Sequence, residues 1–298
     1  MPENAQQPLT HRPVDDNIAL CNGVAVRVDE FIGRAVALSE RLPDVPYVIN
    51  LCSDRYEYLL GFCAAVIAGQ CTLMPPNRQK QTILGIAKDY EGAYALGGQC
   101  IDGIESFALD DIGNSCAISD MPRIPDEQLC AIAFTSGSTG EPKPNRKYWK
   151  TLRTSTADTA DLILGVPDKT FNFVATVPPQ HMWGLEMSVL FPMLTNVAIS
   201  SKTPFFPSDI LAALEELPRP RAIVSSPVHL NALINADLPG IEIDRIYTAT
   251  APMPVELAQR LEEKFSAQVI DVFGCSESGI IAARQVTSSA EWQLARTI

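Results

Sequence analysis

Residues 131–143 read Ala-Ile-Ala-Phe-Thr-Ser-Gly-Ser-Thr-Gly-Glu-Pro-Lys, and this stretch decides the fold class. The apolar run 129–134 predicts a buried strand, and it leads into a loop with two glycines and four hydroxyl side chains that ends at Lys143. Glycines let backbone N–H groups point toward an anion, hydroxyls donate to phosphate oxygens, and the lysine adds a positive charge. The pattern Gly-x-x-x-x-Gly-Lys-Ser/Thr does not fit, so this is not a Walker A motif. We predict a strand followed by a phosphate-binding loop; a surface Ser/Gly turn is the alternative.

Strand and helix patterns alternate on both sides of this loop. Short apolar runs predict strands, and amphipathic stretches predict the helices between them. The predicted strands are 47–52, 71–74, 93–96, 129–134, 171–177, 197–200, 222–225, 246–247 and 269–272. The predicted helices are 55–68, 82–88, 148–164, 184–194, 208–216, 228–234 and 255–265.

Such alternation predicts βαβ units, and therefore an α/β fold with mainly parallel sheets flanked by helices. The polar, proline-bearing stretch 110–127 is the expected boundary between two subdomains, 1–125 and 126–298. The second subdomain carries the loop that ends at Lys143.

The composition excludes several classes of protein. Hydrophobic residues make up 46% of the 298 residues, and the formal net charge is -12, so a nucleic-acid-binding protein is not expected. Eight cysteines without a Cys-x-x-Cys pair and only three histidines argue against a zinc site. The N-terminus lacks the pattern of a signal peptide, and the uncharged run 58–77 is interrupted by glycine and prolines. We therefore expect a cytoplasmic protein with no membrane span.

Two further motifs follow the loop in order. The first is Pro178-Pro-Gln-His-Met-Trp-Gly184; the second is Thr250-Ala-Pro-Met-Pro254 together with Asp271-Val-Phe-Gly-Cys-Ser-Glu-Ser-Gly279. With residues 135–143 they resemble the signature segments of the adenylate-forming enzymes, the superfamily of acyl-CoA synthetases, aryl-acid ligases and peptide-synthetase adenylation domains. More weakly, 144–149 resembles the aryl-acid:carrier-protein ligases of aryl-polyene and xanthomonadin-type pigment pathways. The resemblance implies a large N-terminal domain without its C-terminal lid domain, so we expect a truncated chain.

The same resemblance implies a set of site residues. His181 and Lys143 would have the catalytic roles, and Glu277 with Thr135 would bind Mg²⁺, a metal that prefers hard oxygen ligands. The carboxylic acid would contact His181, Trp183, Gly184, Ser226, Pro227 and Ala249. ATP would contact Thr135, Ser136, Gly137, Ser138, Thr139, Gly140, Lys143, Thr250, Ala251, Pro252, Asp271, Val272, Phe273, Gly274 and Ser276.

Each of the less distinctive assignments has a structural alternative. The Phe273 ring could stack on adenine and Asp271 could accept from its exocyclic amine. Glu277 taken alone would be a solvated turn residue, and a lone histidine such as His181 is more often structural. For His229, at a strand-to-helix turn near the expected acyl pocket, structural packing is equally favoured.

The function that the resemblance implies is ATP-dependent activation of a carboxylic acid. The products would be an acyl-adenylate and pyrophosphate, after which the thiol of CoA or of an acyl carrier protein's phosphopantetheine accepts the acyl group. An aryl acid such as a hydroxybenzoate is favoured over a fatty acid, and a truncated chain would be weakly active.

Two other functions stay open at this point. One is an α/β serine hydrolase with Ser276 as nucleophile and His181 or His229 as base, although residues 274–278 depart from Gly-x-Ser-x-Gly. The other is a non-catalytic module that binds a nucleotide or docks a carrier protein.

Overall fold

The computed structural model describes residues 5–98, 100–109, 120–136, 142–165 and 170–296, and the chain divides into two compact units. The first unit comprises Met1–Asp16 and Val26–Arg153, and the second comprises Asn17–Ala25 and Thr154–Ile298. The boundary expected at 125/126 falls inside the first unit, because the strand at 129–136 pairs with the strand at 71–74.

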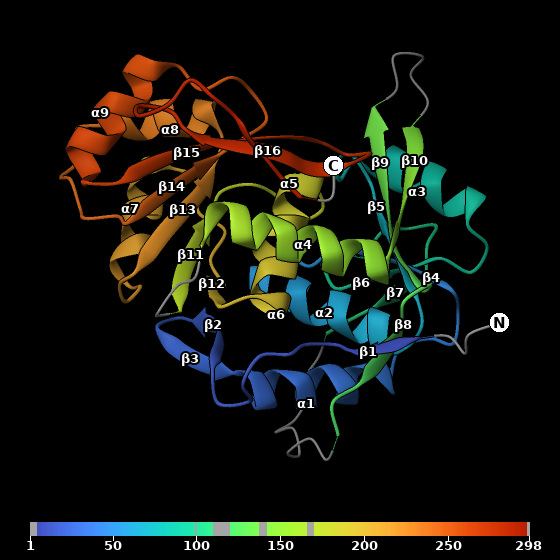
Figure 1. The fold of residues 1–298 in the computed structure, drawn as a ribbon. Coiled ribbons are helices and arrows are strands. Elements are labelled where there is room, and N and C mark those ends of the chain that lie inside the picture. The colour runs from blue at the N-terminus through green and yellow to red at the C-terminus, as the bar shows by residue number, and fades with distance from the viewer. Residues whose placement is uncertain (1–4, 99, 110–119, 137–141, 166–169, 297–298) are drawn as a thin grey trace. The chain divides into compact units, whose positions relative to one another are not determined.

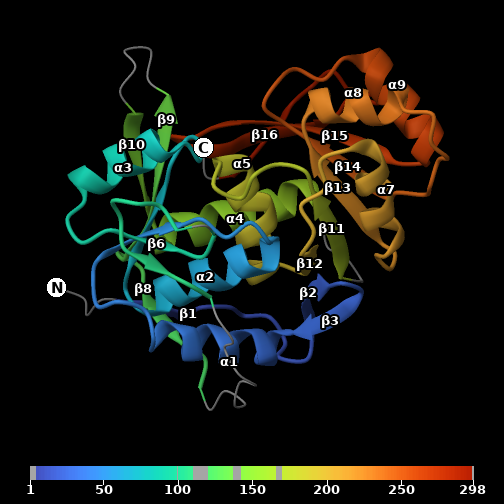
Figure 2. The same cartoon turned by 180° about the vertical axis from the view of Figure 1, so that it is seen from behind.

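The first unit is built on a six-stranded sheet in the order β10-β9-β5-β4-β6-β7, whose strands are labelled in Figure 1. Figure 2 shows its edge strand β10 beside β9. All neighbouring strands are parallel except β10, which runs antiparallel to β9. The strands are β4 (Tyr47–Asn50), β5 (Cys71–Met74), β6 (Tyr94–Leu96), β7 (Ser106–Phe107), β9 (Leu129–Ser136) and β10 (Pro142–Tyr148). Outside this sheet lie α1 (Val28–Ser39), α2 (Arg55–Ile67), α3 (Lys80–Asp89) and the strand pair β1 (Gln6–Pro8) and β8 (Arg123–Pro125).

Helices cover both faces of this sheet because successive residues of a strand point to opposite sides. On β4, Val48 packs in one apolar cluster with Ala65 of α2, whereas Ile49 packs in another cluster with Ile83 of α3. The start of α2 is set by Asp54, whose carboxylate accepts a hydrogen bond of 3.1 Å from the Glu57 N–H.

The second unit contains a nine-stranded sheet in the order β17-β16-β15-β14-β13-β11-β12-β2-β3. The strands from β15 to β2 in this order are parallel, and β16 and β17 continue the sheet antiparallel. The bounds are β2 (Asn17–Cys21), β3 (Val24–Arg27), β11 (Phe171–Ala175), β12 (Val197–Ser200), β13 (Arg221–Ser225), β14 (Arg245–Thr248), β15 (Gln268–Cys275), β16 (Gly279–Gln285) and β17 (Gln293–Leu294).

Three helices lie against one face of this sheet (Figure 1): α7 (Pro207–Glu215), α8 (Pro227–Asn235) and α9 (Val255–Phe265). Ile246 of β14 points into their apolar cluster. Its neighbour Tyr247 points to the other face, where its hydroxyl donates to the Ile163 carbonyl at the end of α4 (Trp149–Ile163). The Arg245 guanidinium donates to the same carbonyl at 2.6 Å, so a cation and a hydroxyl satisfy the C-terminus of α4.

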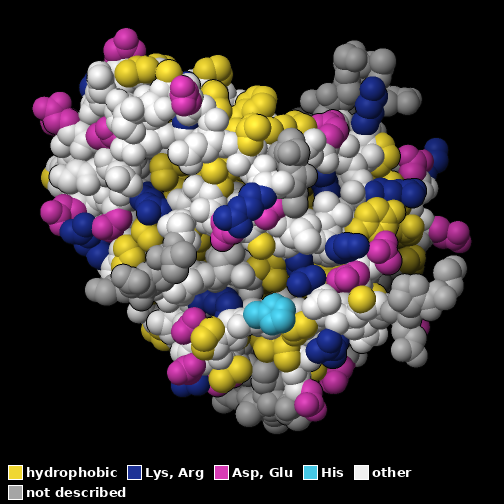
Figure 3. Space-filling view, in the orientation of Figure 1, with side chains coloured by type: hydrophobic (Ala, Val, Ile, Leu, Met, Phe, Trp, Pro, Cys, Tyr) yellow, Lys and Arg dark blue, Asp and Glu magenta, His cyan; other side chains and the backbone are white. Residues whose placement is uncertain are grey.

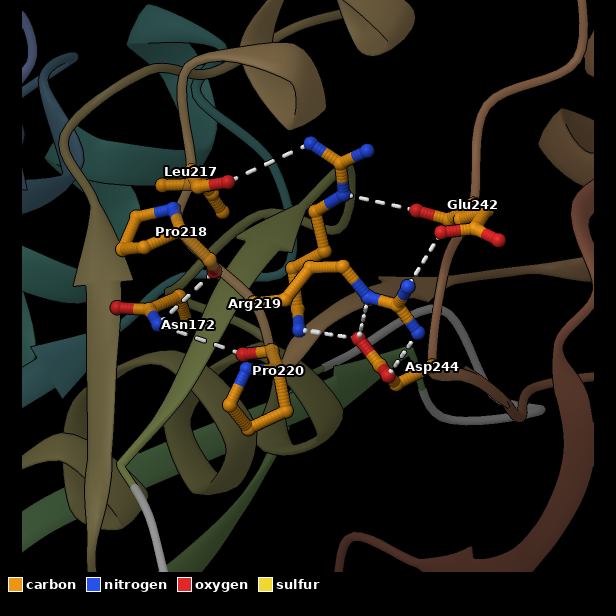
Figure 4. Close-up of polar contacts among 8 residues, drawn as sticks. Asn172, Leu217, Pro218, Arg219, Pro220, Glu242 and Asp244 are labelled. Atoms are coloured by element: carbon orange, nitrogen blue, oxygen red, sulfur yellow. Dashed lines mark hydrogen bonds and ion pairs between the residues drawn. The ribbon is translucent and has the colours of Figure 1, made fainter.

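Polar contacts join the loops at the amino ends of β11, β13 and β14 (Figure 4). Arg219 contacts Asp244 through two nitrogens, at 3.2 and 2.6 Å, and forms a further ion pair with Glu242. Asp244 also accepts from the Arg221 N–H at 2.8 Å. The Asn172 side chain of β11 donates to the carbonyls of Pro218 and Pro220, so side chains of one strand and of the loops before β13 and β14 hold this edge.

The α/β fold with mainly parallel sheets and flanking helices is confirmed, but three local predictions change. The helix predicted at 148–164 is present as α4, but the strand β10 between the loop and this helix was not predicted. The strand predicted at 269–272 is longer, as β15, and it continues through a hairpin into β16, which was not predicted. The helix predicted at 184–194 consists of α5 (Met182–Leu185), a π-helical turn η1 (Glu186–Leu190) and α6 (Phe191–Leu194). None of the helices in the described ranges has the length and apolar character to cross a bilayer.

Candidate active site

A pocket of about 190 Å³ opens in the second unit, at the carboxyl edge of its parallel strands. Three segments form it: the stretch after β11, the turn after β14 and the hairpin turn between β15 and β16. The lining residues are His181, Met182, Trp183, Glu186, Ala249, Thr250, Val272, Gly274, Cys275, Ser276, Gly279 and Ile280. Ligands of open α/β sheets bind outside the carboxyl ends of the strands, so this pocket is the candidate site.

The first segment is shaped by a close approach of its own backbone. A Cβ atom on Gly184 would lie 1.9 Å from the Pro178 carbonyl oxygen, so only glycine fits there. His181 takes the N-cap position of α5, and Trp183 is buried with its indole N–H donating to the Ser225 carbonyl at 3.3 Å. The Pro-x-x-His-x-x-Gly spacing therefore places His181 and Trp183 together at the pocket wall.

The second segment has an unusual backbone. Thr250 has a φ of +79°, which is rare for a β-branched residue and costs conformational energy. The preceding Thr248, at the end of β14, is fully buried, and its hydroxyl has no hydrogen-bond partner in the described part of the chain. Strain and an unsatisfied hydroxyl at the same strand end are typical of a site shaped for a ligand.

The third segment is a tight hairpin turn. Gly279 has a φ of +78°, and a Cβ atom there would lie 2.6 Å from the Glu186 carboxylate oxygen Oε1. The turn presents Ser276 half-buried at the pocket and Glu277 exposed beside it. Glycine is therefore required at 279 both by the turn and by Glu186.

Charged groups at the site differ in their surroundings. Partial burial lowers the pKa of His181, so its imidazole is neutral at pH 7. Asp271 is buried and lies 3.1 Å from the Arg284 guanidinium; burial raises its pKa although Arg284 opposes the shift. Asp271 thus forms an ion pair with a residue of the neighbouring strand β16.

Phe273 points away from the buried interior. Its ring is 55% exposed and meets the Trp292 ring edge-on, with centroids 5.9 Å apart. The guanidinium of Arg284 lies 4.5 Å from the Trp292 ring centroid, so the tryptophan joins Phe273 to the Asp271–Arg284 pair.

The phosphate-loop motif belongs to the first unit. Thr135 on β9 and Lys143 on β10 are directly opposite each other in the antiparallel register. Gly137, Ser138, Thr139 and Gly140 lie outside the described residues, as does the side chain of Ser136. The two ends of the motif are therefore paired, with the Lys143 side chain exposed.

The pocket brings together part of the predicted set, namely His181, Trp183, Ala249, Thr250, Val272, Gly274 and Ser276. Gly184, Ser226, Pro227, Ala251, Pro252, Asp271, Phe273 and Glu277 do not line it. Sequence reasoning missed Met182, Glu186, Cys275, Gly279 and Ile280 as lining residues. Glu186 carried a signal, because it is a lone charge within the apolar run 185–190.

The histidines do not support a serine hydrolase. The Nδ1 atom of His229 lies 2.9 Å from the Thr176 hydroxyl, which in turn contacts the Ser225 hydroxyl at 2.8 Å. Within the described residues, neither His181 nor His229 is hydrogen-bonded to Ser276. In the described part of the chain, Ser276 therefore lacks the hydrogen-bonded histidine that would activate it as a nucleophile.

The donor set suits Mg²⁺ held mainly by a substrate. Among the described residues no group of three or more His, Cys, Asp or Glu side chains could enclose a metal ion. Mg²⁺ commonly binds through one or two carboxylates plus substrate phosphates and water. One exposed carboxylate, Glu277, beside the Ser276 hydroxyl fits that mode of binding.

Comparison with known proteins agrees with this geometry. The chain is 29% identical over 174 residues to a 4-coumarate–CoA ligase of Rhodobacter capsulatus, a match that covers 57% of this chain and 44% of that relative. It is 24% identical over 165 residues to a 3,4-dihydroxybenzoate–[aryl-carrier protein] ligase of Bacillus anthracis, covering 52% and 37%. The chain thus spans less than half the length of these curated relatives.

Structural comparison shows the same fold. The crystal structure of ATP-bound MatB from Rhodopseudomonas palustris matches with a TM-score of 0.74 at 18% identity, covering 93% of this chain and 61% of that one. The family model for the AMP-binding enzyme matches residues 56–298, which include all three pocket segments and the phosphate-loop motif. The chain therefore belongs to the AMP-binding enzyme family.

Proposed function

We propose that this protein binds ATP and activates a carboxylic acid as an acyl-adenylate, which it passes to a thiol. The observation that carries the proposal is the pocket, where His181, the strained Thr250 turn and the hydroxyl of Ser276 meet. A neutral imidazole, a close-approach backbone turn and a hydroxyl can contact an acid, a nucleobase and a phosphate respectively.

The residues would act by positioning and by electrostatics. Neutral His181 can donate a hydrogen bond to the carboxylate of the acid, and Ser276 can donate to the α-phosphate. Lys143 and the loop before it would stabilise charge on the phosphates as pyrophosphate leaves. Mg²⁺, held by Glu277 and Thr135, would neutralise phosphate charge when bound. Phe273 would stack on adenine, within reach of Asp271, Ala251 and Pro252.

An aryl acid is the favoured substrate. Trp183, Val272 and Ile280 give the pocket apolar walls, and the two relatives above are named for coumarate and dihydroxybenzoate. Those names also give two acceptor classes, CoA and a carrier protein's phosphopantetheine thiol, and we propose one of these two as the acceptor. Ser226 and Pro227 would lie beyond the pocket, toward the acyl group's far end.

Ligand-induced stabilisation tests nucleotide binding. ATP and AMP should raise the melting temperature, because a ligand that binds only the folded state stabilises it by mass action. Lys143→Ala should weaken ATP about tenfold, the loss expected for one charge-assisted contact, and leave adenosine unchanged. Equal losses for both ligands would refute the phosphate role.

ATP–pyrophosphate exchange tests the chemistry. With hydroxybenzoate, 4-coumarate and decanoate as acids, exchange should be fastest with an aryl acid, and CoA or a phosphopantetheinylated carrier should then accept the acyl group. Labelling of Ser276 by a fluorophosphonate would instead support a hydrolase, and nucleotide binding without exchange by any acid would support a non-catalytic module.

A further inference from the structure

Glu186 is a buried carboxylate that none of the roles above uses. Its side chain is almost fully enclosed, with the residue only 5% exposed, and it lines the pocket from the first turn of η1. A buried carboxylate is expensive to desolvate and persists where hydrogen bonds hold it. A single-turn π-helix is also uncommon and is often found at functional sites.

The carboxylate contacts the hairpin turn directly. Its Oε1 accepts a hydrogen bond of 3.2 Å from the backbone N–H of Ile280, the second residue of β16. A Cβ atom on Gly279 would lie only 2.6 Å from the same oxygen. Glu186 is therefore packed against the exit of the turn that presents Ser276 and Glu277.

Glu186 and His181 belong to one continuous helical segment. His181 is the N-cap of α5, and η1 begins directly after α5 at Glu186. The segment is itself held, because Ser188 donates to the Gly184 carbonyl at 2.6 Å and Trp183 donates to Ser225. One helical segment thus carries both His181 and Glu186, the residue that accepts the hydrogen bond from the hairpin.

We propose that Glu186 is a positioning residue whose carboxylate holds the β15–β16 turn, and with it Ser276 and Glu277, in register with His181. The part concerning nucleotide rests on the proposed function; the part concerning the turn does not. Because Glu186 acts through the Ile280 N–H, an amide oxygen can replace its carboxylate there, whereas a methyl group cannot.

A matched control exists on the same strand. Glu262 of α9 also accepts, through its Oε1, from a backbone N–H, that of Val269 on β15, at 2.9 Å. This contact lies at the opposite end of β15 from the turn. Glu262→Ala therefore removes an equivalent hydrogen bond without touching the hairpin turn.

Hydrogen–deuterium exchange tests the turn directly. Glu186→Ala should raise the exchange rate of peptides covering 275–281 about tenfold, and Glu186→Gln should keep it near that of the unaltered protein. Glu262→Ala should accelerate exchange at Val269 and leave 275–281 unchanged. Unchanged exchange in Glu186→Ala, or acceleration in Glu186→Gln equal to that in Glu186→Ala, would overturn the proposal.

Titration of ATP with and without Mg²⁺ tests the consequence for the site. Glu186→Ala should reduce the Mg²⁺-dependent gain in ATP affinity about tenfold, whereas Glu186→Gln and Glu262→Ala should retain it, and adenosine affinity should not change in any variant. Faster exchange at 275–281 in Glu186→Ala together with an unchanged Mg²⁺-dependent gain in ATP affinity would show that Glu186 does not position Glu277. Absence of ATP binding in the unaltered protein would refute the proposed function and leave the exchange result to decide the turn.

Discussion

The two edges of the second unit's sheet are built differently. At the amino edge, Arg219, Asp244 and Asn172 satisfy one another and the loop backbone (Figure 4). At the carboxyl edge, Thr250 is strained and the buried hydroxyl of Thr248 has no partner in the described part of the chain. At the amino edge the polar groups satisfy one another and stabilise the fold. At the carboxyl edge a strained backbone and an unpaired hydroxyl remain, as is common at ligand-binding sites.

The largest effect is expected at Gly184, where the carboxyl edge has no space for a Cβ atom. Gly184→Ala places a methyl group against the Pro178 carbonyl, so the free energy of unfolding should fall by about 3 kcal/mol, measured by urea denaturation. Gly85→Ala in α3, where a Cβ atom meets nothing within 4 Å, should instead raise stability by about 1 kcal/mol. Equal stability of the two variants would show that the backbone at the carboxyl edge can shift to accommodate the added methyl group.

The next largest effect is on ligand binding, which should depend on the carboxyl edge and not on the amino edge. Glu277→Gln keeps the side chain's shape and removes its charge, so the Mg²⁺-dependent part of ATP affinity should fall about tenfold, measured by titration calorimetry. Binding of AMP should change little. Asp244→Asn at the amino edge is the control and should bind ATP like the unaltered protein; intact magnesium dependence in Glu277→Gln would make the carboxylate a turn residue only.

A smaller effect concerns acid stability. Partial burial alone would raise the pKa of Asp244, but the hydrogen bonds from Arg219 and the Arg221 N–H outweigh it and lower the pKa. A carboxyl whose pKa is lower in the folded state stabilises it above the unfolded pKa of about 3.9, and this is lost as pH falls through the folded pKa. Asp244→Asn should therefore cost about 1 kcal/mol at pH 7 and progressively less below pH 4. A difference independent of pH would contradict this origin.

The smallest effect tests the strain. Thr250→Gly removes a side chain from a residue with φ of +79°, so stability should rise by about 0.5 kcal/mol. Ser266→Gly, at the end of α9 with φ of +51°, should give a similar rise. Only Thr250→Gly should also weaken AMP binding, by a few-fold; weaker binding in both variants would mean that strain at the pocket has no special role.

The sequence predicted elements whose signals are local. The helices predicted at 55–68 and 255–265, which the structure has as α2 and α9, needed only the periodicity of apolar residues. The strand β10 was missed because Pro-Lys-Pro-Asn-Arg-Lys-Tyr is poor in strand-forming residues. It is tolerated because β10 is the edge strand, where prolines remove no essential hydrogen bond.

The candidate site was predictable where a motif fixes spacing and not where distant segments meet. His181, Thr250 and Ser276 came from motifs, and the pocket brings them together. Glu186 was missed because its partner Ile280 is 94 residues away, and no local pattern encodes that contact. Asp271 was expected at a nucleobase, but its carboxylate meets Arg284, which depends on the unpredicted strand β16.

The strand β2 has a consequence for synthesis of the chain. Residues 17–21 leave the ribosome early, yet they pair with β12, whose residues 199 and 200 are made about 180 residues later. Until then β2 can pair only with β3, and its other side must stay open. A fragment starting at Thr154 would likewise leave one side of β12 without a neighbour. An open strand edge of this kind recruits other chains, so such a fragment should aggregate during expression unless residues 17–25 are supplied.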